Sequence, residues 1–147
     1  MKIDFYPKDD EVAEKIRKKS NVIFMLLPKK YNQELAENAV NTEIDFIGEE
    51  NTCNILIIND KLLVLGGLGY KQHITKDKIK KILGEMIKTY EFEDDIARGK
   101  SVLMIYSTDL KETYIDSIKE IMYELNGTYK YTEKTAKNLY RHIFIAN

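Results

Sequence analysis

Apolar residues occur along the chain in short continuous runs and in longer stretches at helical spacing, and the two patterns predict strands and helices. Residues 55–58 and 62–65 are continuous apolar runs too short for a buried helix, and the turn-forming pair Asn59-Asp60 lies between them. This arrangement predicts a β-hairpin. Because neither run alternates with polar residues, we expect both strands to be covered on both faces, inside the sheet.

A glycine-rich segment and an amphipathic helix follow the hairpin. Gly66, Gly67 and Gly69 are expected to end the second strand and form a loop. Apolar residues then recur at helical spacing from Ile79 to Tyr90, with one apolar face. The segment from 53 to 90 therefore reads as strand, turn, strand, loop and helix.

The first third of the chain predicts a strand at 2–6 and a helix from the acidic residues at 9–11 to about residue 20. The apolar run 22–27, closed by Pro28, predicts a central strand and completes a βαβ unit.

The next stretch predicts one helix and one strand. Asn32 can cap a short helix that ends at Val40. The alternation of Ile44 and Phe46 with acidic residues predicts a strand with one buried face.

The last third predicts a second strand–helix–strand unit. Residues 102–106 form an apolar strand, and a helix with the capping-box-like spacing of Asp109 and Glu112 follows it. Asn126-Gly127 is expected to end this helix, and two strands at 128–132 and 139–146 close the fold. The whole pattern predicts an α+β fold: a single domain over residues 1–147, with a mixed sheet of about six to eight strands, a central hairpin and three to four flanking helices.

The composition of the chain limits which partners it can bind and in which cellular compartment we expect it. The chain has 23 basic and 24 acidic residues, so it offers no global field for nucleic acid or an anionic membrane. Its one cysteine, Cys53, excludes an intrachain disulfide, and no apolar run approaches the roughly 18 residues of a membrane helix. We expect a soluble cytoplasmic protein that binds neither membrane nor nucleic acid.

The best candidate site is a speculative anion site in the glycine segment, because backbone amides beside a helix N-terminus can hold an anion. Lys76 and Lys78 occupy the first turn after the expected helix cap Thr75, where their positive charges oppose the helix dipole unless an anion is bound. Neither the phosphate-loop motif nor the dinucleotide fingerprint is present, and the alternative is that the glycines only turn the chain and the lysines face solvent. The candidate ligand-binding residues are Gly66, Gly67, Gly69, Lys71, His73 and Lys76.

No complete catalytic or metal-binding set is found in the sequence. His73 and Thr75 match half of the paired His-x-Thr pattern of some phosphodiesterases, but His142 is followed by Ile143 and Phe144, so the second hydroxyl is absent. Two histidines and one cysteine in an apolar strand are too few for a His/Cys metal site. We expect no catalytic residue, no metal and no cofactor.

Two functions remain open. The first is a binding or assembly module without a catalytic constellation, whose partner is another protein or a second copy of the chain. The alternative is a phosphate-ester or nucleotide-binding protein, enzyme or sensor, which holds a small anionic ligand on the loop 66–73 and the following helix N-terminus.

Overall fold

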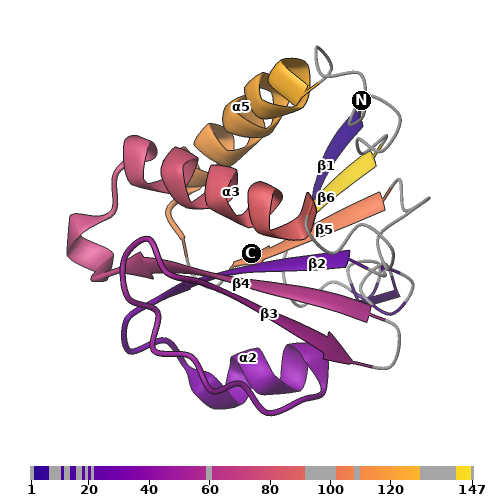
Figure 1. Ribbon diagram of the computed structural model, residues 1–147, viewed down its shortest axis with the longest axis vertical. Helices are drawn as coiled ribbons and strands as arrows, with labels where there is room; N and C mark the ends of the chain where they lie inside the picture. Colours follow the sequence, from indigo (N-terminus) through magenta and orange to yellow (C-terminus); the bar gives the residue numbers. More distant parts are fainter. Residues whose placement is uncertain are drawn as a thin grey trace.

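The computed structural model describes residues 2–6, 11, 14–15, 18, 20, 22–58, 61–91, 102–107, 110–129 and 142–146. In this part of the chain, six strands form one mixed sheet in the order β1-β6-β5-β2-β4-β3 (Figure 1). Neighbouring strands are parallel, except that β3 pairs antiparallel with β4. The strands are β1 (Lys2–Tyr6), β2 (Val22–Pro28), β3 (Cys53–Ile58), β4 (Lys61–Gly69), β5 (Val102–Ser107) and β6 (His142–Ala146).

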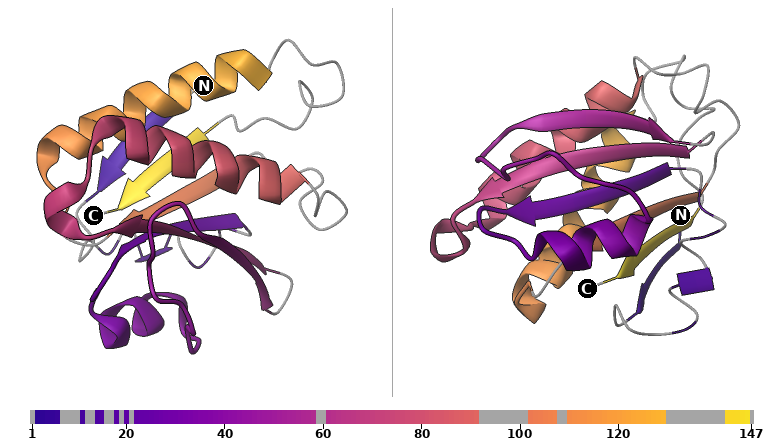
Figure 2. Two further views of the ribbon diagram at one scale, coloured as in Figure 1. Left: turned by 60° about the vertical axis from the view of Figure 1, so that its left-hand side comes forward. Right: turned by 90° about the horizontal axis from the view of Figure 1, so that it is seen from below.

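Helices cover both faces of the sheet. The long helices α3 (Lys76–Glu91) and α5 (Glu112–Tyr129) lie side by side on one face, and α2 (Gln33–Val40) lies on the other (Figures 1 and 2). A short 3₁₀ helix, η1 (Lys71–His73), connects β4 to α3. The predicted class, an α+β fold with one mixed sheet and packed helices, is confirmed in this broad form.

Strand β2 lies in the interior of the sheet and separates two apolar clusters. Every side chain from Val22 to Pro28 is buried. Successive side chains of a strand point to opposite faces, so Phe24 packs with the cluster under α3 and α5, whereas Met25 packs with the cluster on the α2 side. The prediction of a central strand at 22–27 is confirmed.

The predicted hairpin is present, but its position inside the sheet is wrong for one strand. Strand β4 is buried from Leu62 to Gly69, whereas β3 is the outermost strand and Ile57 is 53% exposed. An apolar run reports that side chains pack against covering layers. It does not report whether a second strand pairs with the outer backbone groups.

The glycines do not end β4, which continues through Gly69. The strand predicted at Ile44 and Phe46 is also wrong: residues 43–49 form no strand in the structure. Ile44 is buried and Phe46 packs beside the same cluster, so the alternation in burial is real. Side chains of the α2 region, rather than a neighbouring strand, bind the backbone here.

The helices agree with the sequence at their beginnings more than at their ends. Asn32 caps α2 by accepting from the Leu35 N–H at 3.0 Å, and Thr75 caps α3 by accepting from the Lys78 N–H at 3.2 Å. The predicted end of α5 at Asn126-Gly127 is wrong, because the helix continues to Tyr129. A glycine inside a helix costs about 1 kcal/mol relative to alanine but does not stop the helix.

Some predicted elements lie wholly or partly outside the described residues. The helix predicted over 9–20 lies largely there, and the Asn59-Asp60 turn lies wholly there. The strand predicted at 128–132 is wrong for its first two residues, which belong to α5, and its last three lie outside the described residues. Of the strand predicted at 139–146, the structure describes β6, which pairs with both β1 and β5.

Candidate functional site

A concavity of about 330 Å³ lies at the carboxyl end of β4, beside the end of β2. In open sheets with parallel strands, the crevice outside the carboxyl ends is where ligands commonly bind. Side chains from four segments surround it: the residue after β2, the loop between α2 and β3, the β4–η1 junction, and the first turn of α3. The lining residues are Lys29, Glu49, Glu50, Leu68, Gly69, Tyr70, His73 and Lys78.

Backbone hydrogen bonds join these segments at Gly69. The Lys29 N–H donates to the Gly69 carbonyl at 2.8 Å, and the Gly69 N–H donates to the Gly48 carbonyl at 2.9 Å. Gly69 has a φ of +73°, a conformation that glycine adopts without the strain of a Cβ atom. The chain can therefore turn out of β4 here while remaining bonded to the end of β2 and to the loop.

The loop 41–52 carries Glu49 and Glu50 to the concavity, and side chains from the α2 region hold its first half in place. The Ile44 N–H donates to Glu37 Oε2 at 2.7 Å, and Gln33 Nε2 donates to the Ile44 carbonyl at 2.9 Å. The Tyr31 hydroxyl donates to the Phe46 carbonyl at 2.6 Å. Partial burial, and to a lesser extent the charges of Glu37 and Asp45, raise the pKa of Tyr31, so this hydroxyl stays protonated and remains a donor.

Charged and aromatic groups contact one another at the rim of the concavity. Lys78 Nζ lies 2.8 Å from Glu50 Oε1, and Lys29 Nζ lies 4.6 Å from the centre of the Tyr70 ring. His73 meets the same ring edge-on at 6.1 Å between centroids. The pKa of Glu50 lies below its ordinary value, first because Lys78 donates a hydrogen bond to it and then because of electrostatic attraction to Lys78, Lys81 and His73.

The structure brings together only part of the predicted site. Gly69 and His73 line the concavity, whereas Gly66 and Gly67 lie within β4 and do not. The Gly67 N–H donates to the Thr52 carbonyl at 2.8 Å and the Gly69 N–H is also bonded, so these two amides are not available to an anion. The idea that glycine amides cradle the anion is therefore wrong for Gly67 and Gly69, although side chains nearby still offer positive charge.

The two adjacent glycines have packing roles on opposite faces of β4. A Cβ atom on Gly66 would lie 2.4 Å from Met86 Sδ of α3. A Cβ atom on Gly67 would lie 1.8 Å from the Glu49 carbonyl oxygen. Each glycine is thus explained by the close approach of a covering layer.

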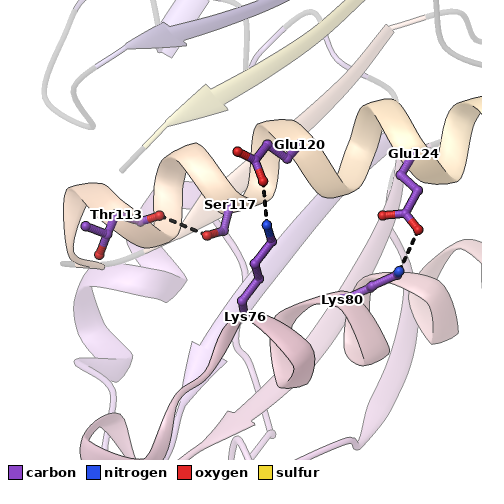
Figure 3. A network of polar contacts seen from close by, with 6 residues as sticks. All are labelled: Lys76, Lys80, Thr113, Ser117, Glu120 and Glu124. Carbon is purple, nitrogen blue, oxygen red and sulfur yellow. Dashed lines mark hydrogen bonds and ion pairs between the residues drawn. The ribbon is translucent and has the colours of Figure 1, made fainter.

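Lys76 points away from the concavity, toward α5. It forms an ion pair with Glu120, and one turn further Lys80 Nζ lies 2.6 Å from Glu124 Oε1 (Figure 3). The carboxylate of Glu120 already offsets the unfavourable position of Lys76 at the start of α3, so no bound anion is needed to explain it. Lys71 is exposed in η1 and is not among the lining residues.

Sequence reasoning missed Lys29, Glu49 and Glu50, whereas Tyr70 and Lys78 lie within the predicted loop 66–73 and the first turn of the following helix. Lys29 and Tyr70 each follow the last residue of a parallel strand directly, and that position is a usable signal once parallel pairing is expected. No local pattern marks Glu49 and Glu50, which reach the site because α2 holds their loop.

Metal binding and thiol chemistry find no support in the described residues. Within that part of the chain, no cluster of three or more His, Cys, Asp or Glu side chains has the arrangement of a metal site. Cys53 lies 3.6 Å from Thr89 Oγ1, and burial raises the pKa of its thiol. A raised pKa lowers the thiolate fraction at neutral pH, which disfavours a nucleophilic role. No helix in the described segments is long and apolar enough to span a membrane.

Comparison with known proteins gives a fold and no family. No family model matches the chain, and no curated protein matches it. Among solved structures, the chain is similar to the bottromycin maturation enzyme BotP in complex with Mn, with 10% sequence identity and a TM-score of 0.54 over 87% of this chain and 27% of that one. A second structure of BotP gives 10% identity and a TM-score of 0.52 over 85% of this chain and 27% of that one. The chain thus shares a fold with about a quarter of a longer enzyme.

Proposed function

We propose that this protein is a binding module whose ligand carries an anionic group and docks in the concavity between β4, η1 and the loop 41–52. The observation that supports this is that Lys29 and His73 lie beside one exposed aromatic ring, Tyr70, and that Lys78 lines the same concavity at the carboxyl end of parallel strands. The concavity, at about 330 Å³, lies at the lower end of the size range of small-molecule sites.

The charges at the rim can be rearranged at little cost. Lys78 and Glu50 form an ion pair whose side chains are 37% and 49% exposed, and such exposed pairs contribute little net stability. An incoming phosphate or carboxylate can therefore replace Glu50 as the partner of Lys78. Glu50 remains solvated when it is displaced.

Tyr70 supplies the apolar part of the site. Its side chain is 46% exposed, and Lys29 lies over one face of the ring. Aromatic rings stack well on planar groups, so a ligand that combines a planar group with an anionic one suits the site. Buried Leu68 provides an apolar wall.

The lining favours binding over catalysis. His73 is its one histidine, and no serine, threonine or cysteine is among the eight lining residues. A covalent mechanism through a serine, threonine or cysteine activated by a neighbouring base therefore has no nucleophile in this lining. The fold shared with part of BotP does not bring that enzyme's activity with it, since the chain matches 27% of the enzyme's length.

A phosphate-ester enzyme or nucleotide sensor is the second candidate, because His73 lines the same concavity as Lys78. A sensor would bind nucleotides without changing them. An enzyme would release product from a nucleotide or cyclic dinucleotide, and His73→Gln would abolish that release while leaving binding to Lys78 in place.

A thermal-shift panel of inorganic phosphate, nucleotides and cyclic dinucleotides tests the proposal. A ligand at 100 times its Kd adds about 2.7 kcal/mol of stability, or roughly 5–10 °C in Tm for a chain of this size. Lys78→Gln should reduce the shift strongly. Lys88→Gln on the exposed far end of the same helix is the matched control and should retain it. If no ligand of the panel shifts the Tm, or if both variants respond like the wild type, this site is not where the ligand binds.

A further inference from the structure

Among the described residues, β3 is the last strand of the sheet, and it carries no charge, proline or bulge that would discourage pairing on its outer side. In the described part of the chain, β3 pairs with β4 and no strand pairs with its other side (Figure 1). Natural edge strands are commonly protected by charged residues, proline or bulges. Strand β3 reads Cys-Asn-Ile-Leu-Ile-Ile, and its register with β4 runs without a shift.

The backbone groups on this open side belong to the odd-numbered residues. Thr52, one residue before β3, accepts from the Gly67 N–H, which places the even-numbered carbonyls toward β4. The Ile55 N–H donates instead to the side chain of Asn54, at 2.9 Å. Alternate residues of an antiparallel strand direct their backbone groups to opposite sides. The backbone N–H and C=O groups of Cys53, Ile55 and Ile57 therefore point away from β4.

The side chains of the same residues are apolar and incompletely covered. Cys53 and Ile55 are partly buried beside the cluster under α3, and Ile57, which shares their side of the strand, is 53% exposed. An exposed isoleucine on an uncharged edge strand is an apolar surface that a further strand would cover.

We propose that a second copy of this chain pairs with β3, strand against strand and antiparallel, about a two-fold axis at Leu56. In this register Ile55 lies opposite Ile57 of the second copy, and Ile57 lies opposite Ile55 of the second copy. Each pair exchanges N–H···O bonds in both directions. The side chain of Asn54 leaves the Ile55 N–H when the second strand arrives.

The second copy is the occupant that the strand itself favours. An antiparallel strand pairs with its own copy by two-fold symmetry, so the outward groups at residues 55 and 57 match in both directions. Because β3 carries no charge, self-pairing brings no like charges together. The two sheets then become one continuous sheet with α3 on the same face in both copies. This association is independent of the ligand proposed above.

One pair of short strands buries much less than the roughly 800 Å² per partner of a standard stable interface. The dimer should therefore be weak and concentration-dependent. Sedimentation velocity over a dilution series should show a mass that rises from one protomer toward two protomers. A single protomer mass at every concentration would overturn the proposal.

Two substitutions at Ile57 distinguish pairing through the β3 edge from non-specific association of the chain. Ile57→Lys places a charge on the edge and Ile57→Pro removes an outward N–H, so each should give protomers at all concentrations. Ile47→Lys is the matched control, because Ile47 is 66% exposed but lies in the loop 41–52 and not in β3, so this variant should associate like the wild type. Association that persists in both Ile57 variants contradicts the proposal.

Amide hydrogen exchange distinguishes strand pairing from contact through side chains. At high protein concentration, protection should increase at the outward amides of Ile55 and Ile57. The inward amides of Asn54 and Leu56 should keep the protection that β4 already gives them. An increase elsewhere with none at the outward amides would show that another surface associates. Circular dichroism of both Ile57 variants confirms that a loss of association is not a loss of folding.

Discussion

The two faces of β4 meet their covering layers in different ways, and the adjacent residues Gly66 and Gly67 show the difference. On the α3 face, the space that a Gly66 side chain would occupy is filled by the side chains of Met86 and Ile82. On the opposite face, the space beside Gly67 is filled by the Glu49 backbone and by Thr52 Oγ1.

The two obstacles differ in how easily they can move: one is a flexible side chain and the other is backbone. Met86 has an unbranched, adaptable side chain that can take another rotamer. The Glu49 carbonyl belongs to a backbone segment bonded to Gly67 itself, through the Asn51 N–H and the Thr52 carbonyl. The helical face should therefore tolerate added volume, and the loop face should not.

Gly67→Ala should have the largest effect on stability. The added Cβ atom would lie 1.8 Å from the Glu49 carbonyl oxygen, so the loop must leave β4 and break the hydrogen bonds around residue 67. We expect a loss of about 3 kcal/mol or more, which corresponds to roughly 6–12 °C in Tm. Urea unfolding measures it. A loss below that of Gly66→Ala would contradict the comparison.

Gly66→Ala should destabilise less, by about 1–2 kcal/mol, because Met86 can move its terminal atoms. A double-mutant cycle with Met86→Ala tests the cause. If the Met86 side chain is the obstacle, Gly66→Ala should cost less in the Met86→Ala background than in the wild type. Equal costs in both backgrounds would place the obstacle elsewhere.

Gly84→Ala should stabilise the protein. Gly84 lies inside α3, and a Cβ atom there would meet no heavy atom within 4 Å. Alanine is favoured over glycine in a helix interior by about 1 kcal/mol. The variant should unfold at a higher urea concentration with an unchanged m-value. A loss of stability would indicate that α3 needs this position without a side chain.

The smallest expected effect concerns the exposed pair of Glu50 and Lys78 on the loop face. Because the pKa of Glu50 is lowered in the folded protein, its contribution is complete above its ordinary value of 4.5 and is lost as the pH falls through the lowered pKa. The stability difference between the wild type and Glu50→Gln should therefore shrink below pH 4.5. A difference that stays constant from pH 7 to pH 3 would mean that the pair contributes nothing.

The helical face and the loop face of the sheet also differ in how well the sequence predicts them. Helix α3 carries a regular apolar face, β2 carries a continuous apolar run, and Thr75 marks a helix start, so local spacing was sufficient for each. The segment around Ile44 was misassigned because its alternation reports burial, whereas its backbone partners are the side chains of Gln33 and Glu37. Those partners are distant in sequence and have no periodic signal.

The candidate site likewise contains residues that the sequence predicts and residues that it does not. Gly69 and His73 lie in one continuous segment, and the prediction placed both near the ligand. Lys29 and Glu50 reach the concavity from other segments, so their roles depend on strand order and on the path of the loop. Lys76 was assigned to the site from the helix dipole alone, and its actual partner, Glu120, lies 44 residues away.

The hydrogen bonds that Tyr31, Gln33 and Glu37 make to the loop have a kinetic consequence. A loop that must fold over its ligand adds a closing step after the first encounter and loses conformational entropy at that moment. Here the first half of the loop is already fixed by its own chain before any ligand arrives. Ligand association should then follow a single fast phase whose rate rises linearly with ligand concentration, with no slower step at saturation.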